Sequence, residues 1–324
     1  MTSNNENPTT PLVTVLLPVL NGQEWIFECL KSLVAQTFTD YEILIIDDGC
    51  TDSSIQIAED MSLTAIRIIK GPKKGLGAAL ALGVNLIKSP FIARQDQDDF
   101  SNPQRLEKQV AYMNSHPECV IVGTNAFKVD ELGLRYGTTK VPLDGKSIKL
   151  QLNLYNPFVH TSVLMRRESV LAAGNYHVRE GMIFAEDYDL WSRMSHTGDF
   201  CNLREALVSY RSNPRGISEG NARELRTSAC AIAVNNVNTS LGFSLTKYDS
   251  SLISSFYGRS SRISVRDALR LYGIMFRLFS KFGFPPPLHG FRLHDFLAPM
   301  VWVLRKPHIP DRLPFDEKGY NMSD

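Results

Sequence analysis

Short apolar runs alternate with segments of helical spacing along the first part of the chain. The apolar runs are rich in Val, Ile and Leu and cover residues 12–20, 42–46, 65–69 and 91–93. The segments between them, residues 24–36, 53–61 and 78–87, place apolar residues three and four positions apart. Continuously apolar strands joined by helices are typical of a mostly parallel sheet with helices on both faces. The pattern therefore predicts the α/β fold class.

The pattern changes in the second half of the chain. It predicts a helix, a strand, a polar edge insertion or hairpin, a second strand and a second helix, at residues 103–115, 120–127, 130–144, 159–165 and 185–195. From Arg223 onward it predicts helices, of which 265–282 is the clearest, followed by a stiff break at Pro285–Pro287. We therefore expect a flexible N-terminus over residues 1–10, an α/β domain over 11–215 and a mainly helical C-terminal extension over 216–324.

Composition narrows the functional classes. The 324 residues include 35 basic and 34 acidic side chains, so the formal charge of +1 provides no overall field for nucleic acid. Five widely spaced cysteines form no CxxC pair, which favours free thiols in a reducing compartment over a zinc site. Residues 1–10 lack the pattern of a secretory signal, and the apolar stretch 296–304 is too short to span a membrane. The expected location is cytoplasmic.

Carboxylates crowd together directly after the apolar run 91–93. Asp96, Asp98 and Asp99 fall within four residues, where they repel one another unless a cation neutralises them. A divalent cation shared with a phosphate would do so, because Mg²⁺ and Mn²⁺ prefer oxygen ligands. A solvated acidic turn is the alternative, since Asn102 followed by Pro103 would also begin a helix well.

Polar residues also follow the neighbouring strands of the predicted sheet. Asn21 ends the first apolar run, and Asp47 and Asp48 end the second. In open α/β sheets, ligands bind beyond the carboxyl ends of the strands, so these side chains should meet the acidic cluster at one edge. A carboxylate there can accept hydrogen bonds from a nucleobase or a ribose, or it can fix the turn into the following helix.

Four motifs occur in a fixed order along the chain. They are Pro18-Val19-Leu20-Asn21-Gly22, Asp47-Asp48-Gly49-Cys50-Thr51-Asp52, Arg94 to Asp99, and Ala185-Glu186-Asp187-Tyr188-Asp189-Leu190-Trp191. In order and spacing, residues 10–215 resemble the family 2 glycosyltransferases, which are inverting enzymes with the GT-A nucleotide-diphospho-sugar transferase fold. The resemblance implies a GT-A domain over 11–215.

The resemblance also implies roles for residues on the donor side. It assigns donor binding to six residues, with Asp48 reading the nucleotide: Pro18, Asn21, Asp47, Asp48, Lys74 and Asp96. Asp96 and Asp98 correspond to the DxD element, whose carboxylates hold Mn²⁺ or Mg²⁺ against the two phosphates. A metal suits this site because it stabilises the negative charge that develops on the departing nucleoside diphosphate.

On the acceptor side the resemblance points to a general base. It implies that Asp187 deprotonates the acceptor hydroxyl with support from Glu186, and that His160 and Trp191 contact the acceptor. Each has a structural alternative: the two carboxylates would also stabilise a helix N-terminus, and the histidine and tryptophan could lie in the core. The chain departs from the family at Cys50, where Ser is usual and is a better hydrogen-bond donor.

The predicted function is therefore inverting transfer of a sugar, with UDP as the expected nucleotide of the donor, to a hydroxyl of a glycan or lipid-linked saccharide. Basic residues among the C-terminal helices suggest peripheral contact with the inner membrane face, with a solvated helix face as the alternative. A nucleotidyltransferase is disfavoured because residues 16–22 contain one Gly and no Lys or Arg. A non-catalytic module that binds sugar nucleotides is the third alternative.

Overall fold

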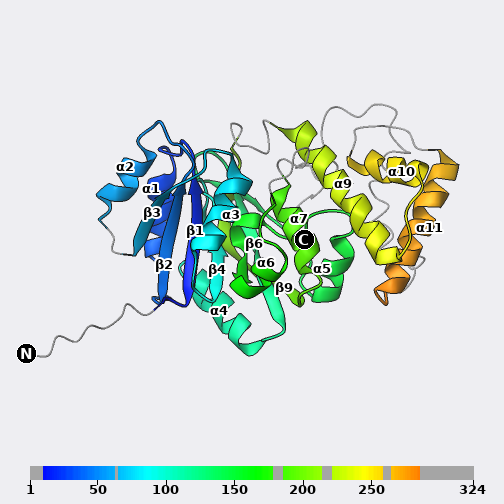
Figure 1. Cartoon of the computed structure of the whole chain (residues 1–324), viewed down its shortest axis with the longest axis horizontal. Coiled ribbons are helices and arrows are strands. Elements are labelled where there is room, and N and C mark those ends of the chain that lie inside the picture. Colours follow the sequence, from blue (N-terminus) through cyan, green and yellow to red (C-terminus); the bar gives the residue numbers. More distant parts are fainter. Residues whose placement is uncertain (1–9, 63–64, 178–184, 214–220, 258–263, 285–324) are drawn as a thin grey trace, which may run out of the picture. The chain divides into compact units, whose positions relative to one another are not determined.

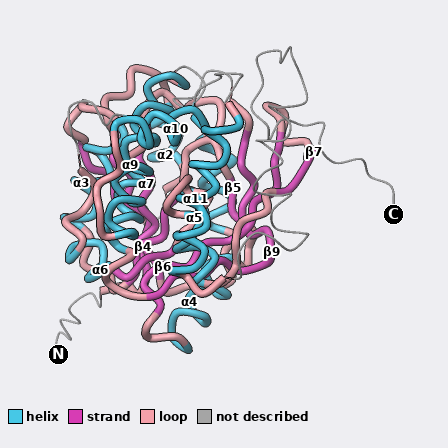
Figure 2. The backbone as a smooth tube through the Cα atoms, turned by 90° about the vertical axis from the view of Figure 1, so that its right-hand side faces the viewer, coloured by secondary structure: helices cyan, strands magenta, loops and turns pink. Residues whose placement is uncertain are grey.

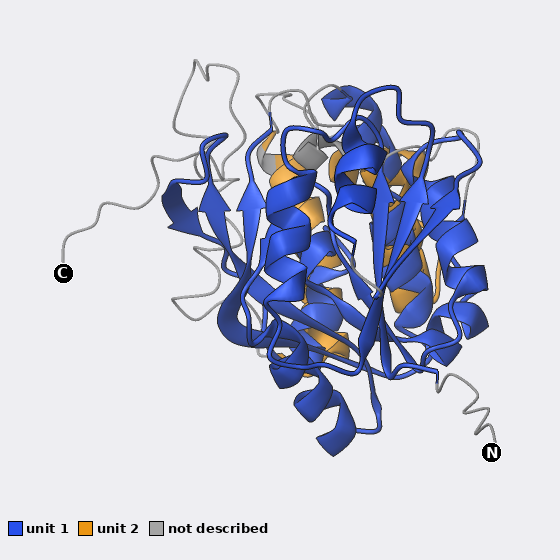
Figure 3. Ribbon diagram, turned by 90° about the vertical axis from the view of Figure 1, so that its left-hand side faces the viewer, with its two compact units in different colours: residues 1–228 blue, residues 229–324 orange. Residues whose placement is uncertain are grey.

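The structure is a computed structural model that describes residues 10–62, 65–177, 185–213, 221–257 and 264–284. The chain divides into two compact units, Met1–Ser228 and Ala229–Asp324 (Figure 3). The predictions for residues 1–9, for the break at 285–287 and for the stretch 296–304 lie outside the described residues. The predicted domain boundary after residue 215 stays a prediction.

The first half of unit 1 folds as the sequence predicts. Strands β1 (Val13–Val19), β2 (Tyr41–Asp47), β3 (Ile66–Lys70) and β4 (Phe91–Arg94) are all parallel, in the order β3-β2-β1-β4. They alternate with helices α1 (Ile26–Val34), α2 (Ser54–Asp60) and α3 (Leu76–Leu86). The α/β class and the helix-covered parallel sheet are confirmed.

The sheet continues with mixed strand directions, in the order β4-β8-β6-β9-β5. The elements after β4 are β5 (Phe100–Ser101), α4 (Arg105–Ser115), β6 (Cys119–Val129), β7 (Arg135–Thr138), α5 (Gly145–Gln151), β8 (Leu164–Arg166), α6 (Arg167–Ala172), α7 (Glu186–Met194) and β9 (Asp199–Arg211). β7 pairs antiparallel with β6, which confirms the predicted hairpin. Figure 2 shows β5, β7 and β9 gathered at one side of this unit.

One strand prediction is wrong in its extent. Residues 159–165 were expected to form one strand, whereas the chain first makes a 3-10 turn, η1 (His160–Ser162), and only then enters β8. Ser162 stabilises this turn because both its amide and its hydroxyl donate to the carbonyl oxygen of Val159, at 2.8 Å each. A local side-chain bond of this kind competes with strand pairing.

Apolar side chains on both faces of the sheet hold the helices in place. Val13, Val15 and Leu17 of β1 are buried on one face, in a core cluster with Leu30 of α1 and Val110 of α4. The alternating residue Leu16 faces α3, where a β-carbon on Gly83 would lie 2.2 Å from Leu16 Cδ1. Only a glycine allows this close helix-to-strand contact. Figure 1 shows α1 and α3 on opposite sides of these strands.

Unit 2 is helical in its described part, as predicted. It contains most of α9 (Ala222–Leu241), together with α10 (Lys247–Tyr257) and α11 (Val265–Lys281). Ser264 begins α11 with a capping box to Asp267, and Arg270 of α11 pairs with Asp249 of α10. None of the helices in the described part of the chain has both the length and the apolar character needed to cross a membrane.

Candidate functional site

The loop after β2 is fixed by carboxylates that accept hydrogen bonds from backbone amides. Asp47 Oδ1 accepts from the amides of Gly49 and Cys50 at 3.0 and 2.8 Å. Burial opposes ionisation of Asp47, but these two amides outweigh it and hold the pKa of Asp47 below its usual value. Asp47 therefore stays ionised and shapes the turn.

Asp48 reaches a segment that lies far away in sequence. Its two carboxylate oxygens accept from the amides of Lys73 and Gly75 at 2.7 and 2.8 Å, and the residue is buried. Asp48 thus ties the loop after β2 to the loop after β3. Lys74 lies between these two contacts with an exposed side chain, which is free to approach an anionic ligand.

The loop after β1 is bound to the same assembly. Asn21 has a positive φ of 50°, and its Oδ1 accepts from the amide of Thr51 at 2.8 Å. The amide of Gly22 donates to Ser54 Oγ at 2.7 Å. Pro18 lies inside β1 and is buried, so in this structure it supports the strand and offers no surface to a ligand.

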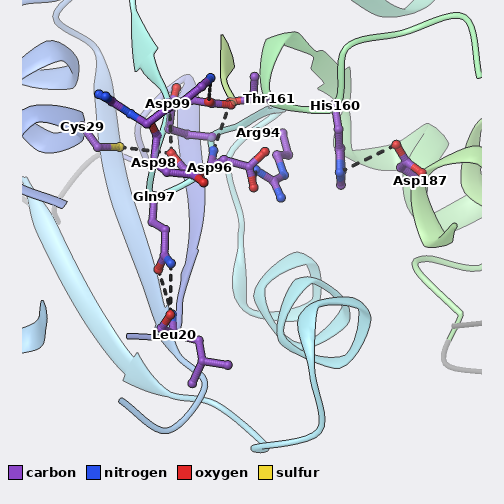
Figure 4. A network of polar contacts seen from close by, with 12 residues as sticks. Leu20, Cys29, Arg94, Asp96, Gln97, Asp98, Asp99, His160, Thr161 and Asp187 are labelled. Atoms are coloured by element: carbon purple, nitrogen blue, oxygen red, sulfur yellow. Dashed lines mark hydrogen bonds and ion pairs between the residues drawn. The ribbon is translucent and has the colours of Figure 1, made fainter. Parts of the chain in front are cut away.

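The acidic loop after β4 lies beside a buried guanidinium, that of Arg94 (Figure 4). Arg94 is 1% exposed and forms an ion pair with Asp96. The amide of Asp96 donates to Thr161 Oγ1 at 3.0 Å, which attaches the loop to η1. Burial disfavours the charge of Arg94, yet Asp96 outweighs it and raises the pKa of Arg94 further. Arg94 therefore holds a permanent positive charge beside the carboxylates.

The charged forms of Asp98 and Asp99 are disfavoured in the folded protein. Burial, followed by repulsion from Asp96, raises the pKa of Asp98 and raises that of Asp99 well above its usual value. Asp98 Oδ2 accepts from Asn213 Nδ2 at 3.0 Å, and Asp99 Oδ1 accepts from the amide of Arg211 at 2.8 Å. One oxygen of Asp99, Oδ2, is buried without a hydrogen bond.

The sequence prediction missed several residues that hold this loop. Arg211 Nε donates to the carbonyl oxygen of Asp98 at 2.9 Å, and Arg105 Nη2 donates to that of Arg94 at 2.7 Å. Arg105 is fully buried, and burial, followed by repulsion from Arg94, lowers its pKa to about 9. Arg105 begins α4 among polar residues and Arg211 ends β9, and no local signal in the sequence reveals the partners of either residue.

The N-terminus of α7 carries the second acidic group. Asp187 accepts from Asn156 Nδ2 at 2.6 Å through Oδ2 and from the amide of Tyr188 at 2.7 Å through Oδ1. Burial raises the pKa of Asp187, and these hydrogen bonds offset part of the effect. Burial and repulsion from Asp187 raise the pKa of Glu186 to about 7. Two acids of elevated proton affinity therefore begin this helix.

His160 lies between the two acidic groups (Figure 4). Its Nε2 is 3.1 Å from the hydroxyl oxygen of Tyr176, whereas Nδ1 is 3.9 Å from Asp187 Oδ2, beyond hydrogen-bond distance. Burial, assisted by the positive charge of Arg94, holds the pKa of His160 well below its usual value. His160 is therefore neutral near pH 7 and serves as a polar, uncharged wall of the site.

Trp191 lies on α7 and packs against His160. It has no exposed surface, and its ring packs edge-on against Phe158 and His160 at centroid distances of 5.8 and 5.9 Å. The structure thus places Trp191 in the core alternative that the sequence left open, where it supports His160.

The acidic loop suits a divalent cation. Across the described residues, no three His, Cys, Asp or Glu side chains are arranged to hold a metal by themselves. Asp96 and Asp98 are two carboxylates on one loop, and burial with repulsion from Asp96 raises the pKa of Asp98, so a cation placed beside it would be favourable. A cation bound by these two residues would need its other ligands from a phosphate group and from water.

Comparison with known sequences gives a consistent result. The profile of Glycosyl transferase family 2 matches residues 14–174. An amylovoran biosynthesis glycosyltransferase, AmsE of Erwinia amylovora, is 32% identical over 207 residues, which cover 62% of this chain and 76% of that protein. The O-antigen biosynthesis glycosyltransferase WbnJ of Escherichia coli is 31% identical over 206 residues, which cover 62% of this chain and 79% of that protein.

Solved structures agree on the fold. Residues 1–349 of S. aureus TarS in complex with UDP-GlcNAc match with a TM-score of 0.59 at 16% identity, over 90% of this chain and 87% of that chain. The mannosyltransferase PcManGT from Pyrobaculum calidifontis, in complex with GDP-Man and Mn²⁺, matches with a TM-score of 0.54 at 14% identity, over 93% of this chain and 82% of that chain.

Proposed function

The chain belongs to the family 2 glycosyltransferases, and we propose that it is a metal-dependent, inverting member that uses a UDP-sugar. The proposed acceptor is a hydroxyl group of a glycan or a lipid-linked saccharide. The proposed pathway is the biosynthesis of cell-surface polysaccharide, which is supported by the names of two relatives, AmsE in amylovoran biosynthesis and WbnJ in O-antigen biosynthesis.

The observation that carries the proposal is that two acidic groups from different elements lie on either side of one buried cation. Asp96 and Asp98 lie on the loop after β4, Asp187 begins α7, and Arg94 interacts electrostatically with members of both groups. A glycosyl transfer needs both groups, because negative charge develops on the leaving diphosphate while the acceptor hydroxyl loses its proton.

On the donor side, the nucleotide would lie against the loops after β1 and β2. We assign nucleotide recognition to the loop that Asp48 organises and phosphate contact to the exposed Lys74. Asp96 and Asp98 would hold Mn²⁺ or Mg²⁺, which supplies electrostatic stabilisation of the diphosphate as it leaves. The TarS and PcManGT complexes, with UDP-GlcNAc and with GDP-Man and Mn²⁺, support a metal-bound nucleoside diphosphate here.

On the acceptor side, Asp187 is the proposed general base. Asn156 and the amide of Tyr188 fix its carboxylate, and burial raises its pKa, which makes it a stronger base than an exposed aspartate. Glu186, with a pKa of about 7, is only part ionised at neutral pH, and its ionised form supports this role. The neutral His160 would orient the acceptor without competing for its proton.

We also propose that unit 2 contacts the membrane surface at its periphery. On α11, Leu269 and Phe276 are exposed beside the exposed Arg266 and Arg277. An apolar stripe flanked by basic side chains is suited to anionic lipid headgroups. Co-sedimentation with vesicles that contain anionic lipid, compared with neutral vesicles, tests this contact; Arg266→Glu with Arg277→Glu should abolish it.

The experiment that tests the function is a transfer assay with the purified chain, UDP-sugars, Mn²⁺ and a lipid-linked saccharide fraction. We expect release of UDP that requires both the acceptor and the metal and that disappears in Asp187→Asn. Donor binding without any turnover would identify a non-catalytic module. Release of pyrophosphate from a nucleoside triphosphate and a sugar phosphate would identify a nucleotidyltransferase instead.

A further inference from the structure

The middle residue of the acidic motif makes an unusual contact with the loop after β1. Gln97 Oε1 accepts from the amide of Leu20 at 2.8 Å, and Gln97 Nε2 donates to the carbonyl oxygen of Leu20 at 3.0 Å (Figure 4). One side-chain amide thus satisfies both backbone groups of a single residue that lies 77 positions away in sequence. These are the two bonds that a neighbouring strand would make.

The contact begins where the sheet stops. The parallel ladder between β1 and β4 ends at the pair Leu16 and Arg94, followed by a bond of 3.2 Å from the amide of Gln95 to the carbonyl oxygen of Leu16. β1 continues to Val19 alongside β2, whereas β4 turns into the acidic loop. The side-chain amide of Gln97 therefore takes the place of a peptide group of the next strand. It extends the connection between β1 and the segment that follows β4.

A glycine makes this contact feasible. A β-carbon on Gly22 would lie 2.6 Å from both Cδ and Oε1 of Gln97, which is closer than real atoms approach. The side chain of Gln97 would then have to leave Leu20. Because the φ of Gly22 lies outside the left-handed region, alanine is compatible with its backbone, and the clash with Gln97 is the main consequence of the substitution.

The loop after β1 is in turn bound to the loop that carries Asp48. Besides the contacts of Asn21 and Gly22, the amide of Ser53 donates to Gln23 Oε1 at 3.1 Å, and the amide of Gln23 donates to Asp52 Oδ2 at 3.0 Å. The contact between Gln97 and Leu20 therefore joins the acidic loop to the nucleotide-side loops.

We propose that Gln97, seated against Gly22, is a positioning residue that couples the metal half of the donor site to its nucleotide half. The inference rests on the proposed function. Gln97 acts through the backbone of Leu20, and its hydrogen bonds hold Asp96 and Asp98 at the spacing from the nucleotide loops that a metal-bound diphosphate requires. Without it, each half keeps its own contacts, and the connection between β1 and β4 ends at the bond from the amide of Gln95 to the carbonyl oxygen of Leu16.

The test compares nucleotide binding with and without Mn²⁺ by calorimetry. Gln97→Met keeps a side chain of similar length but removes both hydrogen bonds, and Gln97→Ala removes the side chain. We expect uridine and metal-free UDP to bind both variants as they bind the wild type, while the gain in UDP affinity that Mn²⁺ provides falls roughly tenfold for the loss of two hydrogen bonds. The matched control is Gln56→Ala, which removes an exposed glutamine that donates to Asp60.

A double-mutant cycle tests the pairing with Gly22. Gly22→Ala alone should reduce the Mn²⁺-dependent gain about as much as Gln97→Ala, by roughly tenfold, and the two together should lose no more than either alone. Melting temperatures within the range of the Gln56→Ala control would show that folding is intact.

Two results would overturn the inference. Equal losses of affinity with and without Mn²⁺ would show that Gln97 serves general loop stability, and an unchanged Mn²⁺-dependent gain would show that the contact is irrelevant to the donor. Failure of the proposed function is a separate result, because the wild type itself would then show no metal-dependent binding of UDP, and the inference would fall with it.

Discussion

The loop after β2 and the loop after β4 both present paired aspartates at the same sheet edge, yet their carboxylates are in opposite conditions. Asp47 and Asp48 accept hydrogen bonds from backbone amides of their own loop and of the loop after β3, and the pKa of Asp47 lies below its usual value. Asp98 and Asp99 are buried against each other and against Asp96, and their pKa values are raised. Backbone amides hold the first pair, whereas burial and repulsion between carboxylates disfavour the charge of the second pair despite the nearby Arg94.

This difference separates two uses of one residue type. A carboxylate that accepts hydrogen bonds from several backbone amides fixes the conformation of the loops around a site. A carboxylate that burial and like charge disfavour is suited to bind a cation or a proton, and Glu186 and Asp187 share this second condition. Substitutions in the first group should therefore change shape and stability, whereas substitutions in the second group should change chemistry or the pH dependence of stability.

The largest expected effect is on turnover by Asp187→Asn. The amide retains the size of the side chain but cannot accept the acceptor proton, so kcat should fall by about a thousandfold. Donor binding, measured by calorimetry, should remain within a few-fold of the wild type. Asp199→Asn, which changes an exposed carboxylate paired with Lys149, is the matched control and should retain full turnover. Retained turnover in Asp187→Asn would exclude it as the base.

A smaller effect is expected from Asp48→Ala in the first group. Losing the acceptors for the amides of Lys73 and Gly75 frees the loop after β3, which should weaken UDP binding roughly tenfold and lower the free energy of unfolding by about 1–2 kcal/mol. Both losses should be the same with and without Mn²⁺, in calorimetry and in thermal unfolding. A loss confined to the metal-bound state would contradict the division between the two loops.

Glu186→Gln should alter the pH dependence of stability. The folded pKa of about 7 lies above the ordinary value of 4.5, so the folded state keeps a proton that the unfolded state releases between these values. Wild-type stability should therefore fall as pH rises from 4.5 to 7, and the glutamine variant should escape this loss. At pH 8 the variant should be more stable by at most about 3 kcal/mol.

Thermal unfolding between pH 4.5 and pH 8 measures this difference. Glu205→Gln is the control, because Glu205 is an exposed carboxylate paired with Lys108 and should show no such gain. A Glu186→Gln effect that is constant across the pH range would mean that packing, and not ionisation, causes it.

The smallest expected effect is that of Asp144→Ala, a carboxylate outside the site. Asp144 begins α5 and accepts from the amide of Ser147 at 2.9 Å, so its removal should cost about 1 kcal/mol of stability. Denaturant titration should show this loss, while UDP binding and turnover stay at wild-type values. A loss of turnover in Asp144→Ala would contradict the assignment of catalysis to the aspartates of the two loops and α7.

The sequence revealed strands β1 to β4 and the acidic residues but not the partners of those residues. Residues 43–46 are continuously apolar because β2 is buried on both faces, and this pattern was readable. Strand β9 was missed because its pairing with β6 shifts register near Thr124 and Asn125, which disrupts the alternation of apolar and polar residues. Asn202 of this strand is polar but buried, because its Nδ2 donates hydrogen bonds to the carbonyl oxygens of Pro142 and Pro157.

The same limit applies to the site. The motifs named Asp48, Asp98 and Asp187, because carboxylates at strand and helix ends are visible in the sequence. The motifs did not show that Asp48 binds backbone amides of Lys73 and Gly75, or that Arg94 lies buried beside Asp96. These contacts join segments that only the folded sheet brings together, so a single sequence carries no local signal for them.

The central claim is that the loop after β4 holds a cation for a nucleoside diphosphate, and calorimetry of UDP with and without Mn²⁺ on the wild type and on Asp98→Asn tests it most directly. We predict that Mn²⁺ strengthens UDP binding to the wild type at least tenfold, as expected for a cation that would neutralise phosphate charge beside Asp98, and not at all to Asp98→Asn. Equal UDP affinity with and without Mn²⁺ in the wild type, or an undiminished metal effect in Asp98→Asn, would contradict the account.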